Sequence, residues 1–183
     1  MSDPSPLLDR AGIEDAFRHL GDRLAMRGVV ADLYVFGGAA MALAYDSRRA
    51  TRDVDALFKP HGVVHEEALA VAADLGLPNW WLNEQASSYI APGGDPAASR
   101  VFDHPGLRVF AASPEHLLAM KALAARPRDA GDIRQLAQVL DLHNADDVLA
   151  SVREIFPEQE PPARLRLLLD DIFSDKKDDQ APD

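Results

Sequence analysis

The sequence predicts an α+β fold in which a small mixed β-sheet is flanked by helices and followed by a helical C-terminal portion. In the first 112 residues, short apolar runs that stop at glycine or proline alternate with segments of helical spacing. After Ser113 the apolar residues recur at helical spacing. A length of 183 residues is enough for one compact domain with a helical appendage. We therefore expect a core at 1–112 and a helical portion packed on it at 113–173.

The predicted core begins with an amphipathic helix and contains two strands. The helix is expected at about 11–27, because apolar residues lie four, three and four positions apart. These residues are Ile13, Phe17, Leu20 and Leu24. A first strand at about 32–36 is stopped by glycine. A second strand at about 53–58 is followed by Pro60 and Gly62, which break it.

Two helices and a hairpin complete the predicted core. Alanine-rich residues favour a helix at about 39–46, and a second helix is expected at about 64–75, where Gly76 stops it. Residues 98–113 are typical of a hairpin, because Pro105-Gly106 suits a tight turn.

The C-terminal portion is predicted to be helical throughout. Ser113 is a favourable N-cap and Pro114 a favourable first residue for a helix that runs to about Ala125. Three more helices are expected at about 129–140, 145–156 and 161–173. Residues 174–183 are acidic and poor in apolar side chains, which predicts a disordered tail.

Composition limits the possible functions. The absence of cysteine excludes disulfides and thiolate metal sites and fits a cytoplasmic protein. No apolar run approaches the roughly 18 residues of a membrane span, and the N-terminus lacks a secretory signal pattern. The net charge of −11 argues against a generally basic nucleic-acid surface. Basic residues nevertheless form two local groups, which indicates a focused anion site. These groups are Arg48, Arg49, Arg52 and Lys59, and Lys121, Arg126, Arg128 and Arg134.

A pair of aspartates suggests a metal site. Asp53 and Asp55 are two positions apart in a predicted strand, so they share one face, while Val54 points into the core. Two carboxylates on one face repel each other, and a cation between them relieves this repulsion. Oxygen ligands favour Mg²⁺, which often binds through one or two carboxylates together with substrate phosphates. Gly37 and Gly38, between a strand and a helix, allow a phosphate to approach the backbone closely.

The order of these features resembles a known signature. Phe36-Gly37-Gly38, fourteen further residues and then Asp53-Val54-Asp55-Ala56 are similar to the signature of the nucleotidyltransferase fold of the DNA polymerase β superfamily. A second stretch, residues 115–136, looks like the C-terminal motif of AbiEii-like nucleotidyltransferase toxins, including the related MenT-like proteins. Small members of this group also share the tripeptide found here at residues 81–83.

The resemblance implies a set of site residues. Gly37 and Gly38 match the phosphate turn, and Asp53 and Asp55 match the ligands of Mg²⁺. Many relatives carry serine where this chain has Gly38, so only backbone donors are expected at that position. The superfamily also has a third carboxylate on a later strand, but the strand at 107–112 contains no acid. The nearest substitutes are Glu84 and Asp103.

Lys121 and Asp132 match the second motif. By the resemblance, Lys121 contacts substrate phosphates and Asp132 acts near the acceptor or the lysine. From the residues alone, Lys121 is a single charge in an apolar helical stretch, so it either meets an anion or extends its ammonium into water. Asp129 is expected to be a helix N-cap. The arginines Arg48, Arg49 and Arg52 are candidates for holding triphosphate or RNA backbone.

The resemblance also implies an activity. Such enzymes transfer a nucleotide from an NTP to an acceptor with Mg²⁺ and release pyrophosphate. In the toxins the acceptor is often the 3′ end of tRNA, and a cognate antitoxin restrains them. Two alternatives remain open: transfer to a protein or a small molecule, and a catalytically degenerate scaffold that binds a nucleotide or a partner. Trp80 and Trp81 are candidates for stacking on a base, although such aromatic residues more often lie in a core or an interface.

Overall fold

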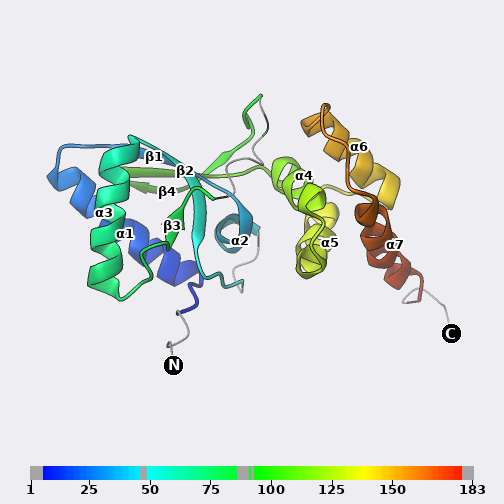
Figure 1. Cartoon of the computed structure of the whole chain (residues 1–183), viewed down its shortest axis with the longest axis horizontal. Coiled ribbons are helices and arrows are strands. Elements are labelled where there is room, and N and C mark those ends of the chain that lie inside the picture. The colour runs from blue at the N-terminus through cyan, green and yellow to red at the C-terminus, as the bar shows by residue number, and fades with distance from the viewer. Residues whose placement is uncertain (1–5, 46–48, 86–90, 92, 179–183) are drawn as a thin grey trace. The chain divides into compact units, whose positions relative to one another are not determined.

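The structure, a computed structural model, describes residues 6–45, 49–85, 91 and 93–178, and side chains as far as Ser174. The chain forms two compact units. The first contains residues 1–89 and 96–112, and the second contains 90–95 and 113–183. The second unit therefore also includes a short segment that precedes the hairpin. Figure 1 traces both units along the chain.

A five-stranded mixed sheet forms the centre of the first unit, in the order β3-β2-β1-β5-β4. The strands are β1 (Ala31–Val35), β2 (Val54–Lys59), β3 (Leu82–Asn83), β4 (Ser99–His104) and β5 (Leu107–Ala111). β1 runs antiparallel to β2 and parallel to β5, and β2 runs parallel to β3. Since β1 pairs with β2, the turn that follows β1 lies beside the strand that carries Asp55.

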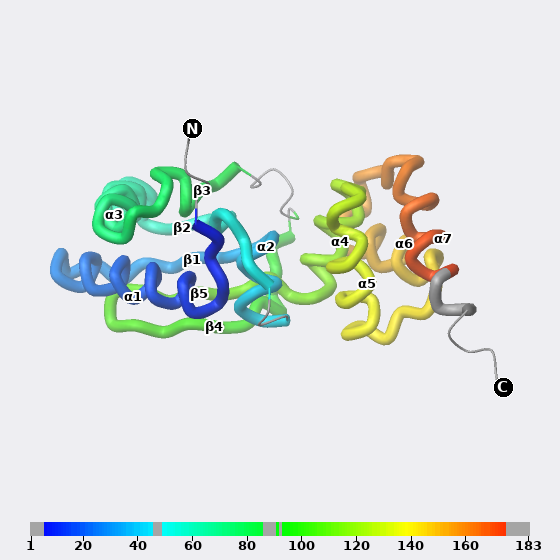
Figure 2. The backbone as a smooth tube through the Cα atoms, turned by 90° about the horizontal axis from the view of Figure 1, so that it is seen from below, coloured from blue at the N-terminus to red at the C-terminus, as the bar shows by residue number. Residues whose placement is uncertain are grey.

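Two helices cover one face of this sheet. α1 (Arg10–Met26) contacts β4 and β5, α3 (His61–Leu75) contacts β2, and the two helices pack side by side (Figure 2). In β1 and β5 buried and half-buried residues alternate, as expected for a sheet with one face in the core. The core includes Phe17, Leu33, Val54, Trp81 and Val109, all fully buried.

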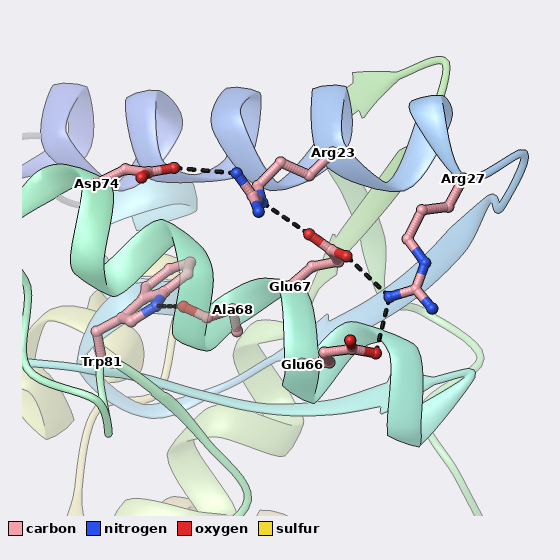
Figure 3. A network of polar contacts seen from close by, with 7 residues as sticks. All are labelled: Arg23, Arg27, Glu66, Glu67, Ala68, Asp74 and Trp81. Carbon is pink, nitrogen blue, oxygen red and sulfur yellow. Dashed lines mark hydrogen bonds and ion pairs between the residues drawn. The ribbon is translucent and has the colours of Figure 1, made fainter.

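A chain of ion pairs joins α1 to α3 (Figure 3). The Glu67 carboxylate, only 10% exposed, accepts hydrogen bonds from Arg23 Nε at 2.7 Å and Arg27 Nη1 at 2.8 Å. Arg23 also contacts Asp74 at 3.1 Å, and Arg27 contacts Glu66 at 2.8 Å. The hydrogen bond from Arg27, assisted by Arg23, lowers the pKa of Glu67 against the opposing effect of burial.

We expect Glu67→Gln to destabilise the protein at neutral pH by about 1–3 kcal/mol, since both arginines lose a charged acceptor. A carboxyl whose folded-state pKa is lowered stabilises the fold above its unfolded pKa of about 4.5, and this contribution is lost as the pH falls through the lower folded-state value. Urea unfolding at pH 7 and pH 3 should therefore show a difference that shrinks in acid. Glu66→Gln is the matched control, because Glu66 is 69% exposed and should contribute little. An equal deficit for Glu67→Gln at both pH values would contradict this account.

The second unit is a small helical bundle. α4 (Pro114–Ala124) packs against α5 (Ala130–Val139) and α6 (Ala145–Ile155), and α7 (Ala163–Asp178) packs against α5 and α6. A 3₁₀ turn at Pro127–Asp129 connects α4 to α5. The buried apolar residues include Leu117, Leu118, Ile133, Leu136, Val148, Val152, Leu165 and Leu169.

Polar contacts hold Ala91 and Asp95 at the start of α4. Ser113 caps α4 as predicted, since its Oγ accepts from the backbone N of His116 at 3.2 Å. The backbone N of Ser113 donates to Asp95 Oδ2 at 2.7 Å, and Ala91 N donates to His116 Nε2 at 3.1 Å. Burial lowers the pKa of His116, while the nearby Asp95 carboxylate opposes this shift. The imidazole is therefore neutral in the conformation in which it accepts this hydrogen bond.

The predicted α+β class is confirmed, with differences in individual elements. β2 ends at Lys59, directly before Pro60, as predicted, and the next helix begins at His61 and not at 64, so Gly62 lies in the first turn of α3. The predicted helix at 39–46 is a short α2 (Gly37–Ala40) continued by a π-helix (Met41–Tyr45). α7 continues to Asp178, past Ser174, where disorder was expected to begin. Residues 179–183 lie outside the described residues, and none of the described helices has the length and apolar composition of a membrane span.

Candidate functional site

The glycine pair and the second aspartate lie together in the structure. Gly37 follows the end of β1 and has φ +63°, a left-handed conformation that favours glycine. Phe36 N donates to Asp55 O at 3.0 Å, which continues the pairing of β1 with β2 past Val35. A Cβ on Gly37 would lie 3.1 Å from Asp55 Oδ2. The turn and the carboxylate are therefore in direct contact, although seventeen residues separate them in the sequence.

Thr51 explains why the second turn position is glycine. A Cβ on Gly38 would lie 2.8 Å from Thr51 Oγ1 and 3.2 Å from Thr51 Cβ. A serine at this position would displace the threonine. Thr51 is itself fixed, because its backbone forms a bridge with Leu8 through hydrogen bonds of 2.7 and 2.8 Å. A hydroxyl group thus lies beside the turn, although it comes from Thr51 and not from the turn itself.

Asp53 lies immediately before β2 and is held at two points. Thr51 Oγ1 donates to the Asp53 backbone O at 3.1 Å, and Asn83 Nδ2 donates to Asp53 Oδ2 at 3.1 Å. Asn83 belongs to β3, where it pairs with Asp55 in parallel register. The two aspartates and this asparagine therefore come from neighbouring strands at one edge of the sheet.

The aspartate pair fits a magnesium ion. Val54 and Ala56 are fully buried, whereas Asp53 and Asp55 are half-buried, so the two carboxylates occupy alternate positions beside a buried row. Both offer hard oxygen ligands, and glycine at position 37 lets the Asp55 carboxylate lie against the turn, since a Cβ there would come within 3.1 Å of Asp55 Oδ2. Mg²⁺ commonly uses one or two carboxylates and completes its shell with water and phosphate oxygens.

The two expected substitutes for a third carboxylate are engaged elsewhere. Glu84 Oε2 lies 2.7 Å from His61 Nε2. Asp103 is on β4, three strands away from β2, and its Oδ2 accepts from Arg100 at 3.1 Å. Within the described part of the chain, no group of three or more His, Asp and Glu side chains is arranged to hold a metal. The pair Asp53 and Asp55 is thus the metal candidate that the described residues offer.

The arginines of the first basic group lie between the glycine turn and the aspartates in sequence. Arg48 lies outside the described residues. Arg49 is half-buried and Arg52 is exposed, directly before Asp53. Of the two tryptophans nearby, Trp81 is fully buried and its Nε1 donates to Ala68 O at 2.9 Å, whereas Trp80 is 44% exposed. Of the two indoles, therefore, only that of Trp80 is exposed enough to stack on a base.

The second unit contains a buried group of charges. Lys121 on α4 is buried, and its Nζ lies 3.0 Å from Asp129 Oδ1 and 2.7 Å from Asp132 Oδ2. Both aspartates are buried as well. Of the two interpretations from sequence, an ammonium extended into water is wrong, and an ammonium paired with carboxylates is correct.

Asp129 occupies the N-cap position of α5, as predicted. Its side chain, however, makes no capping hydrogen bond and instead accepts from Lys121. An isolated buried ammonium is costly, so pairing with Lys121 is worth more than one cap. Asp132 lies in the first turn of α5, as predicted. Arg126 and Arg128, on the connection before α5, are exposed.

Sequence reasoning missed the roles of Thr51 and Asn83. Thr51 follows an undescribed part of a basic connection, and its place depends on a single bridge to Leu8. Asn83 belongs to a strand of two residues, which is too short to show an alternating pattern. The position of Asn83 after two tryptophans was visible, but its contact with Asp53 depends on strand pairing across thirty residues.

Comparison with known proteins assigns the chain to a family. No curated protein and no solved structure matches the chain significantly. A family model described as "Nucleotidyltransferase of unknown function (DUF6036)" matches residues 17–177, which include the glycine turn, both aspartates, Lys121 and Asp132. The chain belongs to this nucleotidyltransferase family.

Proposed function

We propose that the protein transfers a nucleotide from an NTP to the 3′ end of tRNA, with Mg²⁺, as the toxin of a toxin–antitoxin pair. The observation that carries the chemistry is the contact between Gly37 and Asp55. It joins a backbone turn suited to phosphate with a carboxylate suited to Mg²⁺ in one place. In the proposed reaction the acceptor oxygen bonds to the α-phosphorus, the bond to the β-phosphate oxygen breaks, pyrophosphate leaves and the hydroxyl proton is released.

Asp53 and Asp55 would hold the metal in this proposal. Bound there, Mg²⁺ would neutralise charge that develops on the transferring phosphoryl group. Backbone groups of Gly37 and Gly38 would accommodate the triphosphate, with Arg48, Arg49 and Arg52 as further cationic partners. Lys121 and Asp132 are proposed to act on phosphates and near the acceptor. The ion pair between Lys121 and Asp132 supports this role, because it fixes the ammonium in one position.

The toxin assignment rests on the second motif, which is similar to that of AbiEii-like and MenT-like toxins. A tRNA end is the proposed acceptor because the exposed residues Arg52, Arg126 and Arg128 form local basic groups on a chain of net charge −11. Only a few phosphate contacts are available from such groups. A cognate antitoxin protein is the proposed partner, and the cytoplasm is the proposed location.

We expect labelled NTP to mark tRNA in the presence of Mg²⁺. With a few phosphate contacts, the plot of log affinity against log salt should have a slope of about −1 to −3. The measurement is incubation of the protein with each α-labelled NTP and total tRNA or cell extract, followed by separation of labelled polymers and a salt titration of tRNA binding. Label on proteins or small molecules only, or no tRNA binding at low salt, would overturn the tRNA acceptor. No label in any fraction would favour the catalytically degenerate scaffold.

A further inference from the structure

We propose that Asn83 is a positioning residue that fixes the carboxylate of Asp53 for the metal. This inference rests on the proposed magnesium site. Asn83 is half-buried, and its Nδ2 donates to Asp53 Oδ2 at 3.1 Å and to the Trp80 backbone O at 3.3 Å. A ligand carboxylate that is held by a hydrogen bond keeps its orientation before the metal arrives.

The surroundings of Asn83 determine which way its amide points. Gln85 N donates to Asn83 Oδ1 at 3.0 Å. A backbone N–H can only donate, so the side-chain atom facing it is the oxygen. The NH₂ group then faces two acceptors, the Trp80 carbonyl and the Asp53 carboxylate. All three contacts agree with one orientation, and the flipped amide would lose each of them.

Asn83 is itself placed by rigid parts of the first unit. Val54 N donates to Trp81 O at 2.6 Å, and β3 then pairs with β2 in register, with Leu82 opposite Val54 and Asn83 opposite Asp55. The indole of Trp81 is fully buried and hydrogen-bonded to Ala68 O of α3 (Figure 3). The pairing of β3 with β2 therefore places the side-chain amide of Asn83 next to the Asp53 carboxylate.

Asp53 is consequently held through both its backbone and its side chain. Thr51 Oγ1 fixes the backbone O, and Asn83 fixes Oδ2. Such support lowers the cost of reorganisation when a metal binds, because the carboxylate is oriented before the metal arrives. Replacing Asn83 removes this support without removing a metal ligand.

The test compares Asn83→Ala with Asp53→Asn by direct binding of Mn²⁺ as a probe, followed by electron paramagnetic resonance with no nucleotide present. We expect Asn83→Ala to weaken Mn²⁺ binding about 10–100-fold, as is typical when a partner of a ligand is lost. Asp53→Asn should abolish binding at this site. Asn83→Gln, which keeps the amide, should recover part of the affinity.

The control is Asn144→Ala in the second unit. Asn144 Nδ2 likewise donates to a carboxylate, Asp147 Oδ2 at 3.0 Å, and the side chain caps α6. Asn144→Ala should lower the melting temperature of the protein, because α6 loses its cap, without changing Mn²⁺ affinity. If Asp53→Asn abolishes binding while Asn83→Ala binds as tightly as the wild type, the positioning role is overturned and the metal site stands. If the wild-type protein binds no Mn²⁺, both proposals are overturned.

Discussion

Asp55→Asn is expected to lower nucleotide transfer by a factor on the order of 10² or more, with little change in melting temperature. The substitution preserves the shape of the side chain beside Gly37, where a Cβ would lie only 3.1 Å from Asp55 Oδ2. It removes one of the two negative charges proposed to hold Mg²⁺. Because two neighbouring carboxylates repel each other, the loss of one charge should not destabilise the fold. The measurement is the initial rate of pyrophosphate release with tRNA, together with thermal unfolding.

Asp32→Asn is the matched control for this prediction. Asp32 is also a strand aspartate of the same sheet, but it lies at the opposite end of β1 from Gly37 and forms two hydrogen bonds of 2.7 Å with Arg108. This variant should keep its transfer rate and lose a small part of its stability, since the pair is half-exposed. Undiminished transfer by Asp55→Asn, or an equal loss of transfer in both variants, would refute the metal role of Asp55.

The central part of the fold could be predicted because its signals are local. Glycine after an apolar run ended β1, Pro105-Gly106 marked the hairpin, and Ser113 marked the start of α4. Each of these signals depends on backbone preferences of one or two residues. The π-helix at Met41–Tyr45 and the short strand β3 have no comparable signal: alanine-rich residues predict an ordinary α-helix, and two residues are too few to show an alternating pattern.

In the candidate site, too, features with a local sequence signal could be predicted and contacts between distant segments could not. Spacing along the chain predicted that Asp53 and Asp55 share one face of a strand, whereas in the structure β2 begins at Val54 and Asp53 lies immediately before it. The supporting contacts of Thr51 and Asn83 join segments that are distant in sequence, and such pairings depend on sheet register. The chemistry of Asp129 was misjudged because a helix-start aspartate usually caps, whereas here a buried lysine eight residues earlier competes for it.

Lys121→Met is expected to destabilise the second unit by about 3–5 kcal/mol. From the sequence alone, methionine would fill the helix face and the fold would survive. The structure changes this expectation, because Lys121 Nζ is within 3.0 Å of carboxylate oxygens of both Asp129 and Asp132. Without the ammonium, the buried carboxylates of Asp129 and Asp132 would lose the cation that they share. A loss of melting temperature of about 10 °C is the expected size of this effect.

A triple variant separates this structural role from the proposed catalytic one. Lys121→Met combined with Asp129→Asn and Asp132→Asn removes all three charges while keeping the sizes of the side chains, so it should recover most of the lost stability. If Lys121 and Asp132 also act on phosphates and acceptor, the refolded triple variant should remain inactive, because positioning and charge stabilisation supply most of the catalysis of phosphoryl transfer. Thermal unfolding and NTP transfer are measured on both variants. A stable triple variant with wild-type transfer would confine Lys121 and Asp132 to a structural role, and a Lys121→Met protein as stable as the wild type would contradict the buried ion pairs themselves.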